Sequence, residues 1–157
     1  MTQPSPAMDL HNLSAFPGHG IRRVQQVAVA LFMQETEGLG LTPVQFAVLQ
    51  ALSAHPGLDQ KSLAETVSFD TSTIGAVIDR LEGKQLLTRS LSPHDRRVRL
   101  LHLTAAGEAL LAEAMPAVQR TQARILAPLA PQERELFCQL LYKLCADEGS
   151  APARHGA

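Results

Sequence analysis

The chain has 157 residues, a formal net charge of −1 and 45% hydrophobic residues. This length and composition predict a single domain over residues 1–157 with an aliphatic core, because only 4% of residues are aromatic and Trp is absent. They exclude a membrane-spanning helix, since no apolar run approaches the ~20 residues that cross a bilayer. The first residues lack the basic and apolar regions of a signal peptide, so we expect a cytoplasmic protein.

The first predicted helix follows a turn-rich segment. Residues 1–12 contain two prolines, and we expect them to be disordered. The segment Phe16–Gly20 is rich in glycine and proline and predicts a turn. Apolar residues at helical spacing then predict a helix over 21–37, which Gly38 and Gly40 end.

A strong capping signal begins the second helix. Thr42 is the expected N-cap, with Pro43 at the first helical position and Gln45 three residues after the cap. The helix is predicted to run to about His55, because Pro56-Gly57 cannot continue it.

Two more capped helices follow. Asp59 caps a short helix over 60–66, and Asp70 or Thr71 caps a helix that runs to about Gly83. The second of these has an apolar stripe at positions i, i+3, i+4 and i+7, and its other face carries small, hydroxyl and charged residues. The apolar stripe consists of Ile74, Val77, Ile78 and Leu81.

A predicted β-hairpin completes this region. Two β-like runs, 86–91 and 98–103, flank a polar tip at Ser92–Arg97. This order is typical of a winged helix-turn-helix, in which one helix enters the major groove and the β-tip reaches the backbone or the minor groove. We therefore expect a mostly α-helical fold with a small β-wing, and a winged helix-turn-helix over about 41–104.

Charge placement favours DNA binding over a solvated face with scattered charges. From Arg80 to Arg99, six basic residues stand against two acidic ones, a net charge of +4 on a chain of −1. A local basic patch on an acidic body attracts phosphates. The basic residues are Arg80, Lys84, Arg89, Arg96, Arg97 and Arg99.

The C-terminal third is predicted to be helical. Thr104 caps a helix from 105 to about 127, which Pro116 should kink because it removes a backbone donor. A last helix runs over about 131–146, and residues 149–157 are expected to be disordered.

The terminal helices are predicted to mediate dimerisation. The segments 16–38 and 105–147 have broad apolar faces that one chain cannot easily cover, so we expect a two-fold homodimer, with a monomeric bundle as the alternative. Cys138 and Cys145 are ~10.5 Å apart along the last helix, too far for a disulfide within it. Two buried thiols are favoured over a redox or inter-subunit role.

Three motifs resemble the MarR family of bacterial transcriptional regulators. They are Asp79–Arg89 (DRLEGKQLLTR), Asp95–Arg97 (DRR) and Leu103–Gly107 (LTAAG). The resemblance covers about residues 20–147. It implies a homodimer with a winged helix-turn-helix in each subunit, which binds palindromic DNA, commonly as a repressor. It also implies an effector, since many members release DNA on binding small aromatic or phenolic acids.

The resemblance also assigns the DNA contacts. Those on the recognition helix and the wing are Thr71, Ser72, Thr73, Arg80, Arg96 and Arg97. Asp95 matches the acid that holds a wing arginine in place. Gln85 departs from the family's glycine at a helix end, where a left-handed residue is favoured. Val98 stands where a small residue is common, and the N-terminal cysteine of the peroxide-sensing branch is absent.

The segment Pro17–Gln26 resembles a subset of the family that controls nicotinate catabolism and responds to hydroxylated nicotinic acid. An aromatic carboxylate needs a cation or donor and an apolar slot. The candidate effector residues are His11, His19, Arg22, Phe46 and Leu49. A solvated or DNA-backbone role for Arg22, and a helix-cap or core role for His19, are the alternatives.

No enzyme, cofactor or metal site is predicted, because nucleophile-elbow, phosphate-loop and HxxxH or CxxC patterns are absent from the sequence. The expected partners are double-stranded DNA, a small aromatic acid and a second copy of the chain, with no membrane. A metal- or oxidant-responsive regulator of this family remains an alternative. So does a winged-helix interaction module that does not read DNA, although such a module has no need of a basic wing.

Overall fold

The computed structural model describes residues 12–146. Residues 1–11 and 147–157, which include His11 and nearly all of the segments predicted to be disordered, lie outside the described residues. The chain divides after Thr121 into two compact units, and each is described by itself.

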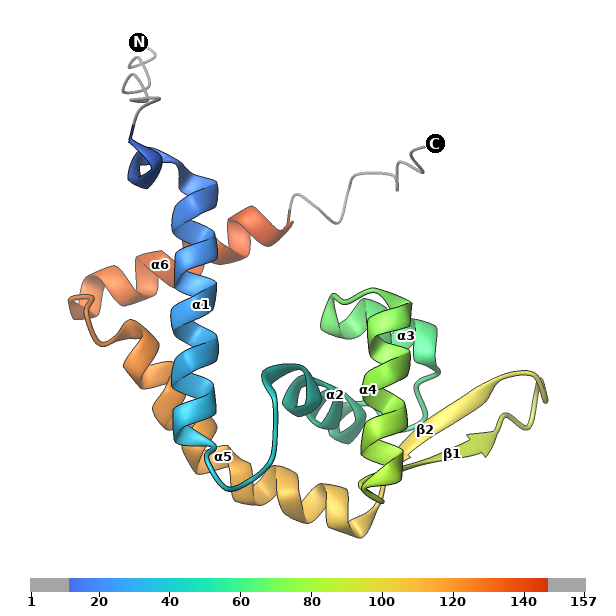
Figure 1. Cartoon of the computed structure of the whole chain (residues 1–157). Helices are drawn as coiled ribbons and strands as arrows, with labels where there is room; N and C mark the ends of the chain where they lie inside the picture. Colours follow the sequence, from blue (N-terminus) through green and yellow to red (C-terminus); the bar gives the residue numbers. More distant parts are fainter. Residues whose placement is uncertain (1–11, 147–157) are drawn as a thin grey trace, which may run out of the picture. The chain divides into compact units, whose positions relative to one another are not determined.

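The first unit holds a short 3-10 helix, four α-helices, a β-hairpin and most of a fifth α-helix (Figure 1). In chain order these are η1 (Leu13–Ala15), α1 (Pro17–Glu35), α2 (Pro43–Ala54), α3 (Gln60–Val67), α4 (Thr71–Gly83), β1 (Leu87–Leu91), β2 (Arg99–Leu103) and α5 (Ala105–Leu126). The second unit contains the last residues of α5 and the whole of α6 (Pro131–Ala146). Within residues 12–146, no helix combines the length and apolar character needed to cross a membrane.

The predicted turn before α1 is wrong. The helix begins at Pro17, four residues earlier than expected, so that the glycines of Phe16–Gly20 are helical. Pro17 occupies the first helical position, where its fixed φ suits the helix and its missing N–H costs nothing. After Glu35 the chain turns through Gly38 (φ 88°) and Gly40 (φ 65°), as their positions predicted.

The side-chain caps predicted for α2 and α3 are confirmed. The Thr42 hydroxyl accepts a hydrogen bond from the Gln45 N–H at 3.3 Å, and the Gln45 side chain accepts one from the Thr42 N–H at 3.1 Å. This reciprocal pair satisfies two N–H groups that the helix itself leaves without partners. Asp59 caps α3 by accepting from the Ser62 N–H at 2.7 Å.

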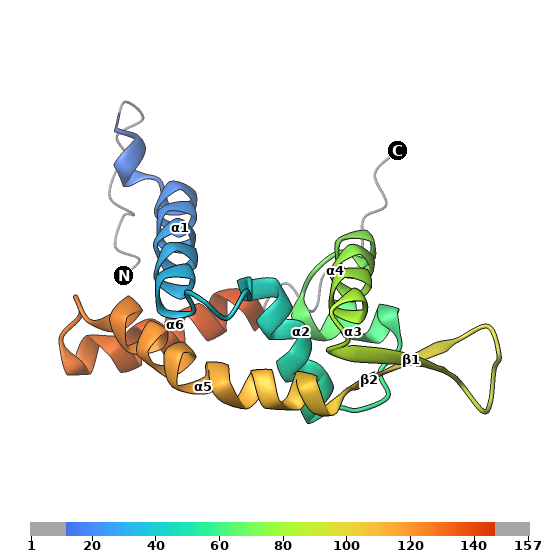
Figure 2. The ribbon, with the colours of Figure 1, turned by 60° about the horizontal axis from the view of Figure 1, so that its bottom comes forward.

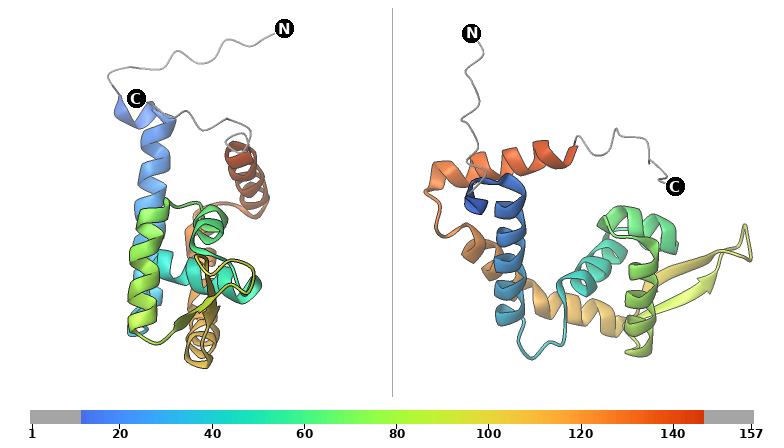
Figure 3. Two further views of the ribbon diagram at one scale, coloured as in Figure 1. Left: turned by 90° about the vertical axis from the view of Figure 1, so that its right-hand side faces the viewer. Right: turned by 45° about the horizontal axis from the view of Figure 1, so that its top comes forward.

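One hydrophobic core joins α2, α3, α4 and the hairpin, which lie together in the views of Figure 3. The predicted apolar stripe of α4 is buried in it. Phe32 of α1 contacts Phe46 of α2, with ring centroids 5.9 Å apart. The largest fully buried hydrophobic side chains of this core are Leu41, Leu49, Leu52, Leu63, Ile74, Ile78, Leu81, Leu87 and Leu101.

The predicted wing is an antiparallel hairpin. β1 and β2 pair from Leu87 opposite Leu103 to Leu91 opposite Arg99. Leu58, in the loop before α3, adds an antiparallel bridge to Leu101 on the other side of β2. Figure 2 shows the hairpin projecting beyond α3 and α4, so that its tip is free of the core. Together with α3 and α4, the hairpin forms the predicted winged helix-turn-helix.

A compact junction connects α4, the hairpin and α5. Gln85 follows α4 with a left-handed backbone (φ 59°), the conformation expected at the position where the family has glycine. The Thr104 hydroxyl donates to the Gln85 carbonyl at 2.7 Å and accepts from the Gly107 N–H at 3.0 Å. Thr104 therefore caps α5, as predicted, and at the same time fixes the end of α4.

In the second unit, α6 buries none of its residues. Its apolar side chains lie in solvent, with Leu140 51% and Leu144 64% exposed. Cys138 and Cys145 are also exposed in this single chain, so the expectation of two buried thiols does not hold here. An exposed apolar helix face of this extent is unusual on a monomeric protein.

Candidate nucleic-acid interface

The beginning of α4 presents two hydroxyl side chains to solvent. The Asp70 carboxylate accepts hydrogen bonds from both the N–H and the hydroxyl of Thr73. These bonds, the hydroxyl's first, hold the pKa of Asp70 below its usual value. Thr73 is thus committed to the helix cap. Thr71 and Ser72 are exposed, and their hydroxyls make no hydrogen bond within the described part of the chain.

Gln60 connects the two helices of the helix-turn-helix. Its side-chain amide donates to the Thr71 carbonyl oxygen at 3.0 Å. The same amide lies over Gly75, where an added Cβ would come within 2.8 Å of the Gln60 nitrogen. The glycine therefore makes room for a bond that sets the first turn of α4 against α3.

The tip of the wing is organised around two side chains. The buried Ser92 hydroxyl accepts from the backbone N–H groups of His94 and Asp95. Asp95 in turn accepts from the Arg97 N–H at 3.0 Å and from the Arg97 guanidinium at 3.2 Å. Hydrogen bonds from Arg97, the backbone one first, lower the pKa of Asp95. Because the Arg97 side chain is still 91% exposed, the turn presents its guanidinium to solvent in a defined position.

Three other cations of this region are available to an external partner. Arg80, Arg96 and Arg99 are exposed, and none of them has an ion pair or hydrogen bond within residues 12–146. Lys84 is less available, since its ammonium group donates to the Gly40 carbonyl at 3.0 Å.

Arg89 is not available, which corrects its place in the predicted basic patch. Its guanidinium forms ion pairs with both Asp79 and Glu82 of α4, and only 26% of its side chain is exposed. The hydrogen bond to Asp79 is the main reason why the pKa of Arg89 is raised further above its usual value. Nothing in the sequence separates Arg89 from the other arginines, because the pairing depends on how β1 packs against α4.

The candidate effector residues do not converge within one chain. His19 and Arg22 lie in the first turns of α1, with 3.5 Å between an imidazole and a guanidinium nitrogen. Phe46 packs against Phe32, which is 13 residues, or ~20 Å of helix, beyond His19. Leu49 is fully buried in the core.

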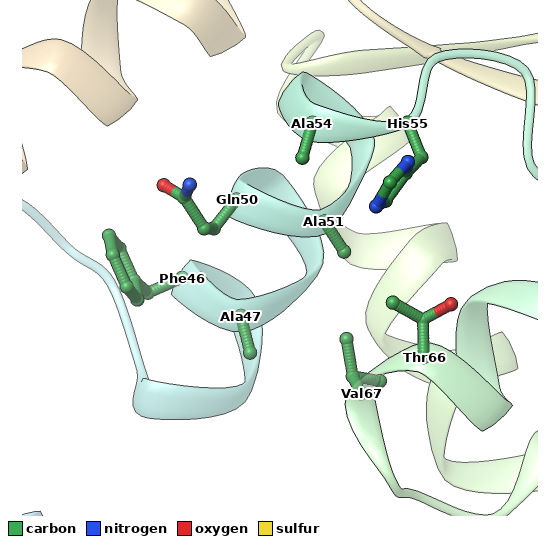
Figure 4. A pocket seen from close by; sticks show the side chains of 8 residues that line it. All are labelled: Phe46, Ala47, Gln50, Ala51, Ala54, His55, Thr66 and Val67. Carbon is green, nitrogen blue, oxygen red and sulfur yellow. The ribbon is translucent and has the colours of Figure 1, made fainter.

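Phe46 does line an open pocket of about 410 Å³ between α2 and the end of α3. In Figure 4, Ala47 and Ala51 of α2 point toward Val67 of α3, while Phe46 lies at the margin. The lining is mainly apolar with a few polar groups, and the volume falls in the range of small-molecule sites. The lining residues are Phe46, Ala47, Gln50, Ala51, Ala54, His55, Thr66 and Val67. The sequence did not predict the pocket, because periodicity alone does not show which face of α2 is left uncovered.

Comparison with known proteins agrees with this geometry. The sequence pattern of the MarR family matches residues 41–98, which hold the helix-turn-helix and most of the wing. The HTH-type transcriptional repressor NicR of Pseudomonas putida is 31% identical over 134 residues, covering 85% of each chain. The chain belongs to the MarR family.

Solved structures of DNA-binding proteins share the fold of this chain. BpsR of Bordetella bronchiseptica, described with regulation of its DNA binding by 6-hydroxynicotinic acid, is 35% identical with a TM-score of 0.77, covering 82% of this chain and 97% of BpsR. The repressor CouR, bound to a 23-mer DNA duplex, is 34% identical with a TM-score of 0.79, covering 85% of this chain and 94% of CouR. This MarR protein is a transcriptional regulator and not an enzyme.

Proposed function

We propose that this protein is a homodimeric repressor that binds a palindromic operator and is released by a small aromatic acid, such as a hydroxylated nicotinic acid. Three relatives support the proposal: NicR is named a repressor, CouR binds a DNA duplex, and 6-hydroxynicotinic acid regulates DNA binding by BpsR. In this chain, the observation that carries it is the pairing of a hydroxyl-led recognition helix with an arginine-bearing wing.

The exposure of the side chains suggests which residues contact bases and which contact the DNA backbone. Thr71 and Ser72 are placed to contact base edges, because the N-terminal residues of a recognition helix come closest to them. Arg96 and Arg97 at the wing, with Arg80 on α4, contact the backbone or the minor groove. Thr73 contributes by holding the cap.

DNA binding is tested by selecting duplexes from a randomised pool with the purified chain. We expect a palindrome whose half-sites lie about one helical turn, ~34 Å, apart. Affinity for the selected duplex should fall steeply with salt, because Lys and Arg release counterions from phosphates. Recovery of no preferred duplex, with no salt-dependent binding, would favour the protein-interaction module instead.

The homodimer explains the exposed apolar side chains of both units. Ile21 and Val24 of α1 are 59% and 45% exposed, and Leu140 and Leu144 of α6 lie equally open. A two-fold dimer covers the same surface on both subunits and so needs no second partner. It also supplies a second reading helix for the second half-site.

The effector site proposed here is centred on the pocket at Phe46. Its apolar walls suit an aromatic ring, and Gln50, His55 and Thr66 offer hydrogen-bonding groups for a carboxylate or hydroxyl. Because His19 lies ~20 Å and Arg22 ~15 Å of helix from the Phe32 contact, they can contribute only if α1 of a second copy reaches the site.

Titration of the protein–duplex complex with nicotinate, 6-hydroxynicotinate and salicylate tests the effector. We expect release by an aromatic acid, which must prefer the non-binding state by ~5.5 kcal/mol to shift the population from 99:1 to 1:99. Phe46→Ala should weaken the release. If α1 of a second copy reaches the pocket, His19→Ala and Arg22→Ala should abolish the release while sparing DNA binding. Release by zinc or peroxide, and by none of the acids, would place the protein in the metal- or oxidant-responsive class.

A further inference from the structure

We propose that Arg89 is a positioning residue for DNA recognition: it clamps α4 to the wing strand and neutralises two carboxylates beside the DNA-reading surface. The inference rests on the proposed DNA binding, and it separates Arg89 from Arg80, Arg96 and Arg97. Arg89 thereby acts on DNA through α4.

The backbone geometry explains why Arg89 meets α4. Side chains on a strand alternate between its two faces, so Arg89 shares a face with the buried Leu87. Its partner across the hairpin is Leu101, which is 1% exposed. The guanidinium therefore extends along the edge of the core, where only 26% of its side chain reaches solvent.

The acceptors on α4 are suitably spaced for one guanidinium. Asp79 and Glu82 are three residues apart and so lie on the same side of the helix. One terminal nitrogen of Arg89 binds Asp79 and the other binds Glu82. A planar fork with several donors can bridge two carboxylates in this way, whereas the ammonium group of lysine lacks the fixed fork geometry that positions both.

The ion pairs of Arg89 also change the charge near the proposed DNA-binding surface. Asp79 is 70% exposed and directly precedes Arg80. Without Arg89, two adjacent carboxylates would repel the phosphates that Arg80 and the wing attract. Neutralising them and fixing the orientation of α4 are two effects of the same contact, and neither requires Arg89 to touch DNA.

A double-mutant cycle distinguishes the clamp from a direct phosphate contact. Affinity for the selected palindromic duplex is measured over a series of salt concentrations for four proteins: the unmodified chain, R89A, D79N/E82Q and R89A/D79N/E82Q. The clamp predicts that R89A weakens binding on the order of tenfold, and that adding D79N/E82Q to R89A restores most of the loss. In the unmodified background, D79N/E82Q should give much less gain, because those charges are already neutralised. The salt slope of R89A should equal that of the unmodified chain.

A direct phosphate contact predicts a different pattern. The gain in affinity from D79N/E82Q would then be the same with Arg89 present and in the R89A variant. R89A would also lower the salt slope by about 0.9. Additivity of the two changes, to within about twofold, overturns the proposal whatever the slope. R99A serves as the matched control, since it removes the same charge from the paired strand without breaking an ion pair.

R89K keeps the test decisive if R89A does not fold. The clamp predicts that R89K binds more weakly than the unmodified chain but more tightly than R89A, because lysine keeps the charge and loses the bridging fork, whereas a phosphate contact would tolerate lysine. R89K binding as tightly as the unmodified chain overturns the proposal. If the unmodified chain itself selects no duplex, the proposed function has failed, and that result is visible before any variant is compared.

Discussion

A Cβ atom on Gly107 would lie 2.0 Å from the carbonyl oxygen of Leu86. That carbonyl accepts a hydrogen bond from the Thr104 N–H at 3.1 Å, so it is fixed in place. The last residue of the LTAAG motif is therefore a glycine for a steric reason. The first turn of α5 approaches the backbone between α4 and β1 too closely for any side chain.

We expect Gly107→Ala to destabilise the protein by at least about 2 kcal/mol, because backbone must move to accept the methyl group. Gly20→Ala is the matched control, since Gly20 is also helical but has no neighbouring atom within 4 Å of the added Cβ. That change should leave stability unchanged or raise it, because alanine favours helix. Urea unfolding of both variants gives the comparison, and equal midpoints would contradict the packing argument.

Arg97→Ala is expected to weaken binding to the selected duplex by ~1–3 kcal/mol, because Asp95 holds this guanidinium ready at the wing tip. Arg96→Ala should lower the salt slope by about 0.9 if Arg96 contacts a phosphate. Fluorescence anisotropy against the selected and a scrambled duplex measures both effects. Unchanged binding by the double alanine variant would show that the wing does not contact DNA.

The cap of α4 should make stability sensitive to acid. The pKa of Asp70 is lowered in the folded protein, so its contribution is present above the pKa of the unfolded chain, ~4, and is lost as the pH falls through the folded pKa. Asp70→Asn keeps an acceptor for the Thr73 N–H but cannot titrate. We expect a smaller decrease in Tm for this variant than for the unmodified chain below about pH 4. Parallel curves of Tm against pH for the two proteins would mean that other carboxylates dominate the loss of stability in acid.

Leu140→Glu should split the proposed dimer, because it places a charge within the apolar stripe of α6. Light scattering of the unmodified chain is expected to give about twice 16.9 kDa. Gln139→Glu is the control, since it adds the same charge at an adjacent polar position. A monomer that binds the palindromic duplex with full affinity would contradict the dimer.

Features set by local chemistry were predictable from the sequence. The caps at Thr42, Asp59 and Thr104 fixed the beginnings of three helices, because each depends on residues within one turn. The left-handed backbone at Gln85 was expected from the resemblance, because the family has glycine at this helix end. The beginning of α1 was not predicted, since two glycines suggested a turn. Pro17 begins the helix there instead, and both glycines are helical.

Features set by packing were not predictable. Arg89 follows Asp79 by ten residues and Glu82 by seven, with the end of a helix between them, so no single periodicity relates the three. Only the approach of β1 to α4 brings the guanidinium to both carboxylates. Leu49 was predicted to contact the effector because it is apolar, as the wall of a pocket would be. It lies in the core instead, next to Val48, which α2 also buries. A single sequence does not distinguish the two faces.

The separation of tasks on α4 has an evolutionary consequence. Its buried stripe, its cap and its ion pairs maintain the fold, while the side chains of Thr71, Ser72 and Ala76 are exposed and make no hydrogen bond within residues 12–146. Substitutions at these three positions can therefore accumulate without loss of stability. Under the proposed reading of DNA by these side chains, duplicated copies of this fold can acquire new target genes by changing a few exposed residues, long before their cores diverge.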